Sequence, residues 1–140
     1  MQVVERMKTK LVVASPTDSV AAAWRLLRQH QIRHLPVVEE GKLVGIVTDR
    51  DIRLVFPSAL TSGRREQDPH DALEKIAVRE IMTGQVVTVA PEAPIANVAR
   101  LLLERRIGGL PVVQGSRLVG IITKTDILAA FVDVVEGESQ

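Results

Sequence analysis

The 140-residue sequence contains no cysteine and no tyrosine, and its only aromatic residues are Trp24, Phe56 and Phe131. The lack of cysteine excludes disulfides, thiolate nucleophiles and thiolate zinc sites. So few aromatic rings argue against a platform on which single-stranded nucleic acid stacks. The 18 basic and 17 acidic residues nearly cancel, leaving a net charge of +1 and no strong field for a polyanion. We therefore predict no nucleic-acid partner.

Long apolar runs are also missing. The longest stretch without a charge, Ile81 to Pro91, is far shorter than the ~20 residues that span a bilayer. The first ten residues carry four charged side chains and lack the apolar core of a signal peptide. The composition is nevertheless 46% apolar, which is enough to fold the bulk of the chain. We expect a soluble, cytoplasmic protein with no membrane partner.

The strongest feature is an internal repeat. Positions 3–53 align with positions 78–128 without a gap, and 21 of the 51 pairs are identical. Such a match indicates two copies of one supersecondary unit. The longest identical blocks are Leu-Pro-Val-Val at 35–38 and 110–113, and Leu-Val-Gly-Ile at 43–46 and 118–121.

Each copy has the pattern β-α-β-β-α. The first copy predicts a strand at Leu11–Val13, a helix opened by Thr17-Asp18-Ser19, hairpin strands at Leu35–Val38 and Leu43–Val47, and a helix from Thr48. The second predicts a strand at Val86–Val89, a helix with Pro94 at its first position that ends at Arg106, hairpin strands at Leu110–Val113 and Leu118–Ile122, and a helix from Thr123. The predicted class is α/β (α+β). Because one small unit cannot bury both faces of its sheet, we expect the two repeats to pack about a pseudo-two-fold axis.

The repeats divide the chain into four parts. We predict a first repeat at 3–56, a linker loop with a short helix at 57–77, a second repeat at 78–132 and an acidic tail at 133–140 that frays from Val132 onward. Within the linker, the polar stretch from Thr61 to His70 is expected to form an exposed loop, and Asp71 to cap the short helix. The apolar face of that helix is expected to include Leu73, Ile76 and Ile81.

The chemistry-bearing motif is Gly-x-x-Thr-x-x-Asp, which occurs at Gly45–Asp51 and again at Gly120–Asp126. Each copy runs from a buried strand into a helix, where threonine and an acid three residues later form a capping box. The same position exposes the amides and positive dipole end that suit phosphate, and the aspartate can accept hydrogen bonds from a ribose diol. The sequence leaves both interpretations open.

The stretch Ile32–Val38, the two Gly-x-x-Thr-x-x-Asp motifs and the methionine that opens each repeat resemble a tandem pair of cystathionine β-synthase (CBS) domains, also called a Bateman module. Four stretches are similar to the CBS pair of acetoin-utilisation accessory proteins: 32–38, 47–52, 107–113 and 121–127. The resemblance implies regulatory sensing of AMP, ADP, ATP or S-adenosylmethionine in a cleft between the repeats. It also implies no catalysis, no required cofactor and an unidentified protein that the module regulates.

The resemblance also implies two sets of nucleotide-binding residues. The first is Ile46, Thr48, Arg50 and Asp51 with Thr83, Val87, Gly108 and Gly109; the second is Ile121, Thr123, Thr125 and Asp126 with Lys8, Val12, Arg33 and His34. The two sets are unequal because Lys8 stands where the other repeat has Thr83, and Arg33-His34 where it has Gly108-Gly109. We therefore expect the Asp126 set, with its cations, to favour phosphorylated ligands.

Two other interpretations remain. The chain is either a ligand-free scaffold for protein association, in which threonine and aspartate only cap helices, or an S-adenosylmethionine sensor. An enzyme is disfavoured because the sequence has no nucleophile elbow or phosphate loop, and its three histidines are scattered without metal-ligand spacing. CBS pairs commonly associate through apolar helix faces, so we expect a homodimer whose interface includes Trp24, Leu54, Phe56, Leu128 and Phe131.

Overall fold

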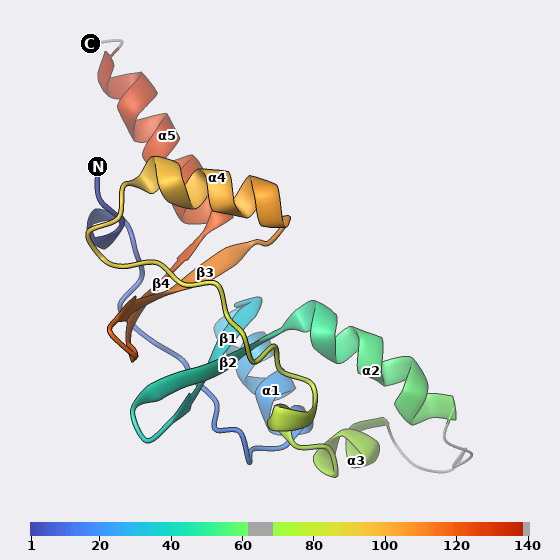
Figure 1. Cartoon of the computed structure of the whole chain (residues 1–140). Helices are drawn as coiled ribbons and strands as arrows, with labels where there is room; N and C mark the ends of the chain where they lie inside the picture. The colour runs from blue at the N-terminus through green and yellow to red at the C-terminus, as the bar shows by residue number, and fades with distance from the viewer. Residues whose placement is uncertain (62–68, 139–140) are drawn as a thin grey trace. The chain divides into compact units, whose positions relative to one another are not determined.

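The computed structural model describes residues 1–61 and 69–138 (Figure 1). It confirms a mixed fold of helices and antiparallel hairpins. In chain order the elements are η1 (Val3–Glu5), α1 (Val20–His30), β1 (His34–Glu39), β2 (Lys42–Thr48), α2 (Asp49–Thr61), α3 (Pro69–Glu74), η2 (Val78–Glu80), α4 (Ile95–Arg105), β3 (Gly109–Gln114), β4 (Arg117–Thr123) and α5 (Lys124–Glu138), where η marks a 3-10 turn.

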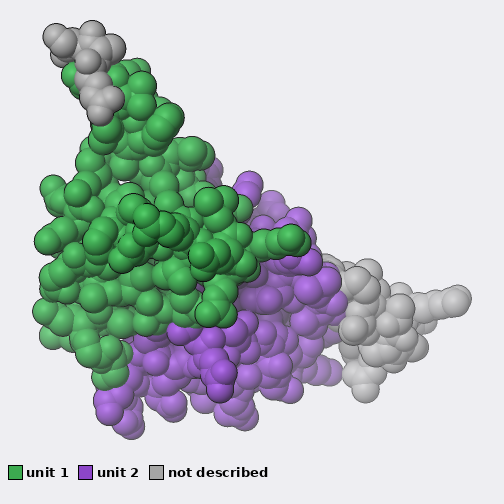
Figure 2. All heavy atoms as spheres, turned by 45° about the horizontal axis from the view of Figure 1, so that its top comes forward, with its two compact units in different colours: residues 1–11, 87–140 green, residues 12–86 purple. Residues whose placement is uncertain are grey.

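The chain forms two compact units, coloured separately in Figure 2. One unit is the continuous stretch 12–86, and the other combines residues 1–11 with residues 87–140. The units therefore differ from the sequence repeats in one respect: the opening segment of each repeat lies with the body of the other. The packing of the repeats about a pseudo-two-fold axis stays a prediction.

The 12–86 unit is built on the β1–β2 hairpin, with α1, α2 and α3 packed in the same unit. Glu40 and Gly41 connect the strands with φ of 51° and 79°. Two left-handed residues give a type I′ turn, whose twist matches that of the strands. Two side chains of the first strand, Leu35 and Val37, are fully buried. The whole core cluster is Ala14, Val20, Ala21, Ala23, Leu27, Leu35, Val37, Val47, Ile52, Leu73 and Val78.

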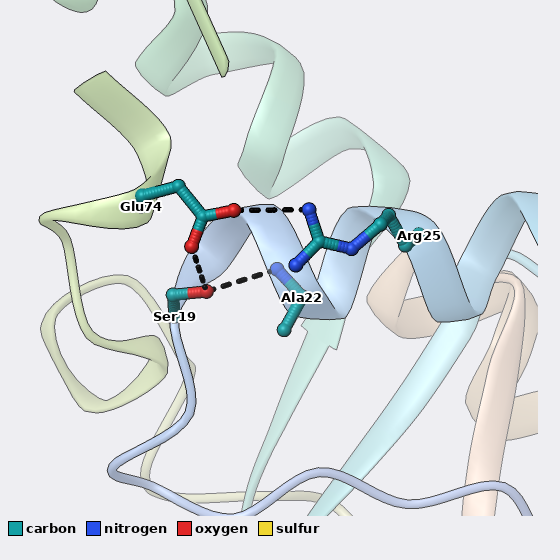
Figure 3. Close-up of polar contacts among 4 residues, drawn as sticks. All are labelled: Ser19, Ala22, Arg25 and Glu74. Atoms are coloured by element: carbon teal, nitrogen blue, oxygen red, sulfur yellow. Dashed lines mark hydrogen bonds and ion pairs between the residues drawn. The ribbon is translucent and has the colours of Figure 1, made fainter. Parts of the chain in front are cut away.

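A polar cluster holds α3 against the start of α1 (Figure 3). The Oγ of Ser19 accepts a hydrogen bond from the backbone N–H of Ala22 at 3.0 Å, which confirms that the predicted Thr17-Asp18-Ser19 stretch opens this helix. The same hydroxyl donates to Glu74 at 3.4 Å, and Arg25 donates to the other carboxylate oxygen at 2.9 Å.

The linker differs from its prediction. The expected loop from Thr61 to His70 falls mainly on residues outside those described, and Pro69 and His70 already belong to α3. Asp71 therefore lies in the first turn of that helix and does not cap it, because proline at the first helical position starts the helix two residues earlier. Leu73 is fully buried, and Ile76 and Ile81 pack against the same core, as predicted.

The other unit carries the β3–β4 hairpin with α4 and α5. Its core cluster is Val3, Val89, Val98, Leu102, Leu110, Val112 and Ile122. Pro94 is the N-cap of α4 and not its first helical residue, because its ψ of 140° is extended. The predicted fraying from Val132 is wrong for residues 132–138, which continue α5, and Arg6 pairs with Asp133 on that extension.

The expected strand at Leu11–Val13 does not form, although its neighbour Ala14 makes one parallel bridge, and the expected strand at Val86–Val89 is reduced to one such bridge. Ala14 bridges Val37 in one unit, and Val89 bridges Val112 in the other. A proline lies two residues after each bridging residue: Pro16 follows Ala14, and Pro91 follows Val89. Proline lacks an N–H for the ladder, so pairing ends there.

The exchanged opening segments are held by matching backbone bonds. In the discontinuous unit the N–H of Val3 donates to the carbonyl of Ala93 at 2.8 Å. In the 12–86 unit the N–H of Val78 donates to the carbonyl of Asp18, also at 2.8 Å. Val3 and Val78 are both fully buried. Each opening segment is therefore part of the core it joins.

Candidate functional site

The glycine of each Gly-x-x-Thr-x-x-Asp motif lies next to the point where an opening segment forms an antiparallel bridge with a strand, which we call the crossing. In the 12–86 unit Thr83 and Ile46 exchange backbone hydrogen bonds of 3.0 and 3.1 Å. A Cβ at Gly45 would lie 2.5 Å from the sulfur of Met82 and 3.0 Å from the carbonyl oxygen of Thr83. Glycine therefore permits the crossing segment to reach the strand.

The same crossing occurs in the discontinuous unit. Lys8 and Ile121 exchange backbone hydrogen bonds of 2.8 and 3.0 Å. A Cβ at Gly120 would lie 2.5 Å from the sulfur of Met7 and 3.1 Å from the carbonyl oxygen of Lys8. The crossing thus brings residue 8 beside β4 and residue 83 beside β2. The sequence interpretation noted the methionines as repeat markers but missed this packing, whose only sequence signal is the shared spacing of methionine and glycine in both copies.

In the first motif, threonine and aspartate form a reciprocal cap on α2. The backbone N–H of Thr48 donates to Oδ2 of Asp51 at 2.8 Å, and the N–H of Asp51 donates to Oγ1 of Thr48 at 3.2 Å. Both residues are half-buried. The capping-box interpretation is therefore confirmed for this motif.

The second motif uses the same residues differently. The N–H of Thr123 donates to Oδ2 of Asp126 at 2.8 Å. The hydroxyl Oγ1 of Thr123 donates to the same oxygen at 3.1 Å. The second oxygen, Oδ1, pairs with Nζ of Lys8 at 3.1 Å. The side chain of Asp126 is 12% exposed, and that of Lys8 is 53% exposed. The chain's own donors therefore contact both oxygens of this carboxylate.

The strand-start residues of the 12–86 unit adjoin the first motif. The carbonyl of Arg33 accepts a hydrogen bond from the N–H of Asp49 at 3.1 Å, and His34 is the register partner of Thr48. Arg33 is exposed and His34 is half-buried. The resemblance assigned both residues to the Asp126 set, and that grouping stays a prediction.

The discontinuous unit has the matching arrangement. The carbonyl of Gly108 accepts a hydrogen bond from the N–H of Lys124 at 2.9 Å, and Gly109 is the register partner of Thr123. Their assignment to the Asp51 set likewise stays a prediction. Four further members of the two sets have simple environments: Arg50 and Thr125 are exposed on the first turns of their helices, and Val12 and Val87 are half-buried against the core of their own unit.

The capping hydrogen bonds do not use all the acceptor positions of the Asp51 carboxylate. A carboxylate has about four lone-pair positions, and the capping hydrogen bond to Asp51 uses one of them, on Oδ2. The remaining acceptor capacity can receive hydrogen bonds from a vicinal diol. The capping interpretation and the ribose interpretation are therefore compatible in the same residue.

Among residues 1–61 and 69–138, no group of three histidine, cysteine, aspartate or glutamate side chains is placed to hold a metal ion. Within the same residues, none of the helices combines the length and the apolar character needed to cross a membrane.

Comparison with known proteins supports the resemblance. The family model for the CBS domain matches residues 2–58 and again residues 78–133. The fold is similar to a crystal structure described as a putative acetoin utilization protein, AcuB, from Vibrio cholerae, with a TM-score of 0.82 and 30% identity over 99% of this chain and 96% of that one.

Two further similar structures contain ligands. CBSX2 was solved in complex with AMP; its TM-score is 0.79, with 28% identity over 95% of this chain and 97% of that one. The CBS domain pair of protein MJ0100 was solved with 5′-methylthioadenosine and S-adenosyl-L-methionine, and its TM-score is 0.78, with 33% identity over 94% of this chain and 99% of that one.

Proposed function

The chain belongs to the CBS-domain family, and we propose that it is a regulatory module that binds an adenosine nucleotide (AMP, ADP or ATP) without catalysis. In this proposal Asp51 and Asp126 each accept hydrogen bonds from a ribose. The other residues that the resemblance assigned to the two sets contact base and phosphate. The protein that the module regulates is a separate partner.

One observation carries the proposal: the chain places the same threonine–aspartate pair at the start of α2 and again at the start of α5, each beside an exchanged segment. A cap alone needs no such crossing, because the capping contacts of Thr48 and Asp51 lie within one turn. The adenosyl ligands of the two similar structures fit the same donor and acceptor chemistry.

A thermal-shift panel with AMP, ADP, ATP, S-adenosylmethionine and NAD tests the proposal. A ligand present at ~100 times its dissociation constant stabilises the folded state by ~2.7 kcal/mol, which is easily measured. We expect stabilisation by at least one of AMP, ADP and ATP. A response to none of the five contradicts the proposal and favours the ligand-free scaffold. A response to S-adenosylmethionine alone favours the sensor of that compound.

The scaffold alternative has its own supporting observation. The reciprocal cap of Thr48 and Asp51 gives this pair a structural role that needs no ligand. The S-adenosylmethionine alternative rests on the ligands of the MJ0100 structure. Both predict that AMP, ADP and ATP leave the unfolding temperature unchanged.

We also propose that the chain forms a homodimer through exposed apolar helix faces. Leu128, Phe131, Val132 and Val135 lie on one face of α5 at helical spacing, and Leu128 and Phe131 are each 64% exposed. Leu54 on α2 is 65% exposed, whereas Trp24 is half-buried against its core with Arg28 over its ring. The side chain of Phe56, also expected at this interface, lies outside those described.

Light scattering of the wild type and of Leu128→Glu with Phe131→Glu tests the dimer. We expect a mass twice that of the 15.3 kDa chain for the wild type and a monomer for the double variant. The matched control is Leu103→Glu, because Leu103 is 79% exposed on α4 and lies outside the expected interface. A wild-type monomer at tens of micromolar, with and without nucleotide, contradicts the proposal.

A further inference from the structure

Asp51 and Asp126 differ in the contacts that the second oxygen of the carboxylate makes within the chain. Both accept the backbone N–H of their own threonine through Oδ2 at 2.8 Å. Among the described residues, only Asp126 also has an ammonium group against Oδ1, that of Lys8 at 3.1 Å. Residue 83, which pairs with Ile46 of β2 as Lys8 pairs with Ile121 of β4, is a threonine and carries no charge.

We propose that Lys8 is a specificity-determining residue of the Asp126 site, which makes that site select adenosine ligands that carry an anionic phosphate. The inference rests on the proposed function and deepens it. A ribose diol must share Oδ1 with the Lys8 ammonium or displace it. A phosphate on the same ligand then provides a new anionic partner for the displaced group.

The structure supports this exchange in three respects. Asp126 is nearly buried and is fixed by Thr123, so its carboxylate stays in place. Lys8 is half-exposed on a flexible four-carbon stem, so its ammonium is the group that moves. Backbone bonds of Lys8 to Ile121 hold the main chain of residue 8 at the strand whatever its side chain is.

An adenosine ligand without phosphate gains less at this site. Its diol still competes with the ion pair, but the released ammonium finds only water. At the Asp51 site the same ligand meets no such competition. The selectivity for ATP over adenosine is therefore expected to be greater at Asp126 than at Asp51.

Calorimetric titration with ATP and with adenosine tests the inference. The Asp51→Ala background isolates the Asp126 site, and Lys8→Thr is added to it. We expect the ratio of ATP affinity to adenosine affinity to fall about tenfold or more, because a charge-assisted phosphate contact is lost while competition for the diol is removed. Lys8→Met keeps the aliphatic stem but removes the charge, and it should lower the ratio by a similar factor.

Two matched variants control for charge and for position. Lys10→Thr removes the same charge from an exposed residue two positions away and should leave the ratio within about twofold. Thr83→Lys in the Asp126→Ala background places an ammonium beside the other aspartate and should raise the ratio there. Circular dichroism of each variant establishes that it is folded.

The outcomes separate the inference from the function it rests on. Absence of nucleotide binding to the wild type overturns both. Binding that Asp126→Ala weakens but whose ATP-to-adenosine ratio is unchanged in both Lys8 variants overturns the inference alone. An equal fall in the ratio for Lys10→Thr also overturns it, since the effect is then one of net charge.

Discussion

The Asp51 and Asp126 motifs have the same residues at the same spacing, yet their hydroxyl groups have opposite roles. Thr48 accepts from the backbone N–H of Asp51, whereas Thr123 donates to the carboxylate of Asp126. The second carboxylate also receives Lys8, a residue far away in the sequence. The same motif therefore makes different contacts in its two copies, and one partner in the second copy comes from a segment far away in the sequence.

The largest effects test whether the two cores are equivalent. Leu35 and Leu110 occupy matching positions and are 0% and 1% exposed. We expect Leu35→Ala and Leu110→Ala each to lower the free energy of unfolding by about 2–5 kcal/mol, because each leaves a cavity. Urea denaturation measures the loss. Leu103→Ala, at an exposed position, should stay within about 0.5 kcal/mol of the wild type.

A cost below about 1 kcal/mol for only one of the two leucines would contradict the equivalence. It would mean that one unit unfolds without affecting the measured transition.

The aspartates test the functional comparison. Asp51→Ala and Asp126→Ala each remove an acceptor of charge-assisted hydrogen bonds, which contribute ~1.5–3 kcal/mol. That is roughly a tenfold to hundredfold loss of nucleotide affinity at one site. Loss of the cap should in addition lower stability by ~1 kcal/mol. Calorimetry with AMP on both single variants and the double variant measures the binding loss.

The matched control is Asp49→Ala, which removes a carboxylate from the first turn of α2 that pairs with Arg53 on the same helix. It should leave the titrations unchanged. If the titrations of all three Asp51 and Asp126 variants also match the wild type, the aspartates act only as caps.

The glycines test the crossings. Gly45→Ala and Gly120→Ala each place a methyl group against a methionine sulfur and a backbone carbonyl. We expect each to lower stability by about 1–3 kcal/mol, because the crossing segment must shift. Amide exchange should accelerate at Lys8 and Ile121 in Gly120→Ala, and at Thr83 and Ile46 in Gly45→Ala.

Gly137→Ala is the control for the glycines. Nothing lies within 4 Å of a Cβ at that position in α5, so alanine should be neutral or stabilise by up to ~1 kcal/mol. Acceleration of exchange at both crossings by either single glycine variant would show that the crossings are not independent.

The smallest effect concerns a contact of α3, a helix of the 12–86 unit. Glu74 of α3 pairs with Arg25, and both side chains are about half exposed. Glu74→Ala should therefore cost no more than ~1 kcal/mol, with a smaller loss at high salt. A double-mutant cycle with Arg25→Ala measures the pair, and a coupling above that value would indicate that α3 supports its unit more strongly than its exposure implies.

Local patterns in the sequence predicted most of the local structure. The two Leu-Pro-Val-Val blocks form buried strands, and Ser19 caps its helix, because these features depend on neighbouring residues. The continuation of α5 through Glu138 was not predicted, because the acidic residues at its end oppose the helix dipole. The structure shows Arg6 paired with Asp133, a contact that local patterns cannot reveal.

The candidate site was only partly predictable for the same reason. The repeat identified Thr48, Asp51, Thr123 and Asp126 by spacing alone. The repeat alone did not show which copy each opening segment joins, and only the resemblance to CBS pairs grouped Lys8 with Asp126 and Thr83 with Asp51. The contact between Lys8 and Asp126 follows from that choice.

The exchange of opening segments also bears on the order in which the chain folds during synthesis. The 12–86 unit is continuous in sequence, so its strands and its crossing segment emerge from the ribosome one after another, without an intervening segment of the other unit. The other unit needs residues 1–11, which are made before the 12–86 unit, and residues 87–140, which are made after it. Domains generally fold as units as they emerge from the ribosome. The apolar side chain of Val3 therefore stays exposed to solvent until α4 and β4, which complete its core, have been synthesised. The segment at residues 1–11 is thus synthesised well before the rest of its unit and joins its core only after α4 and β4 have formed.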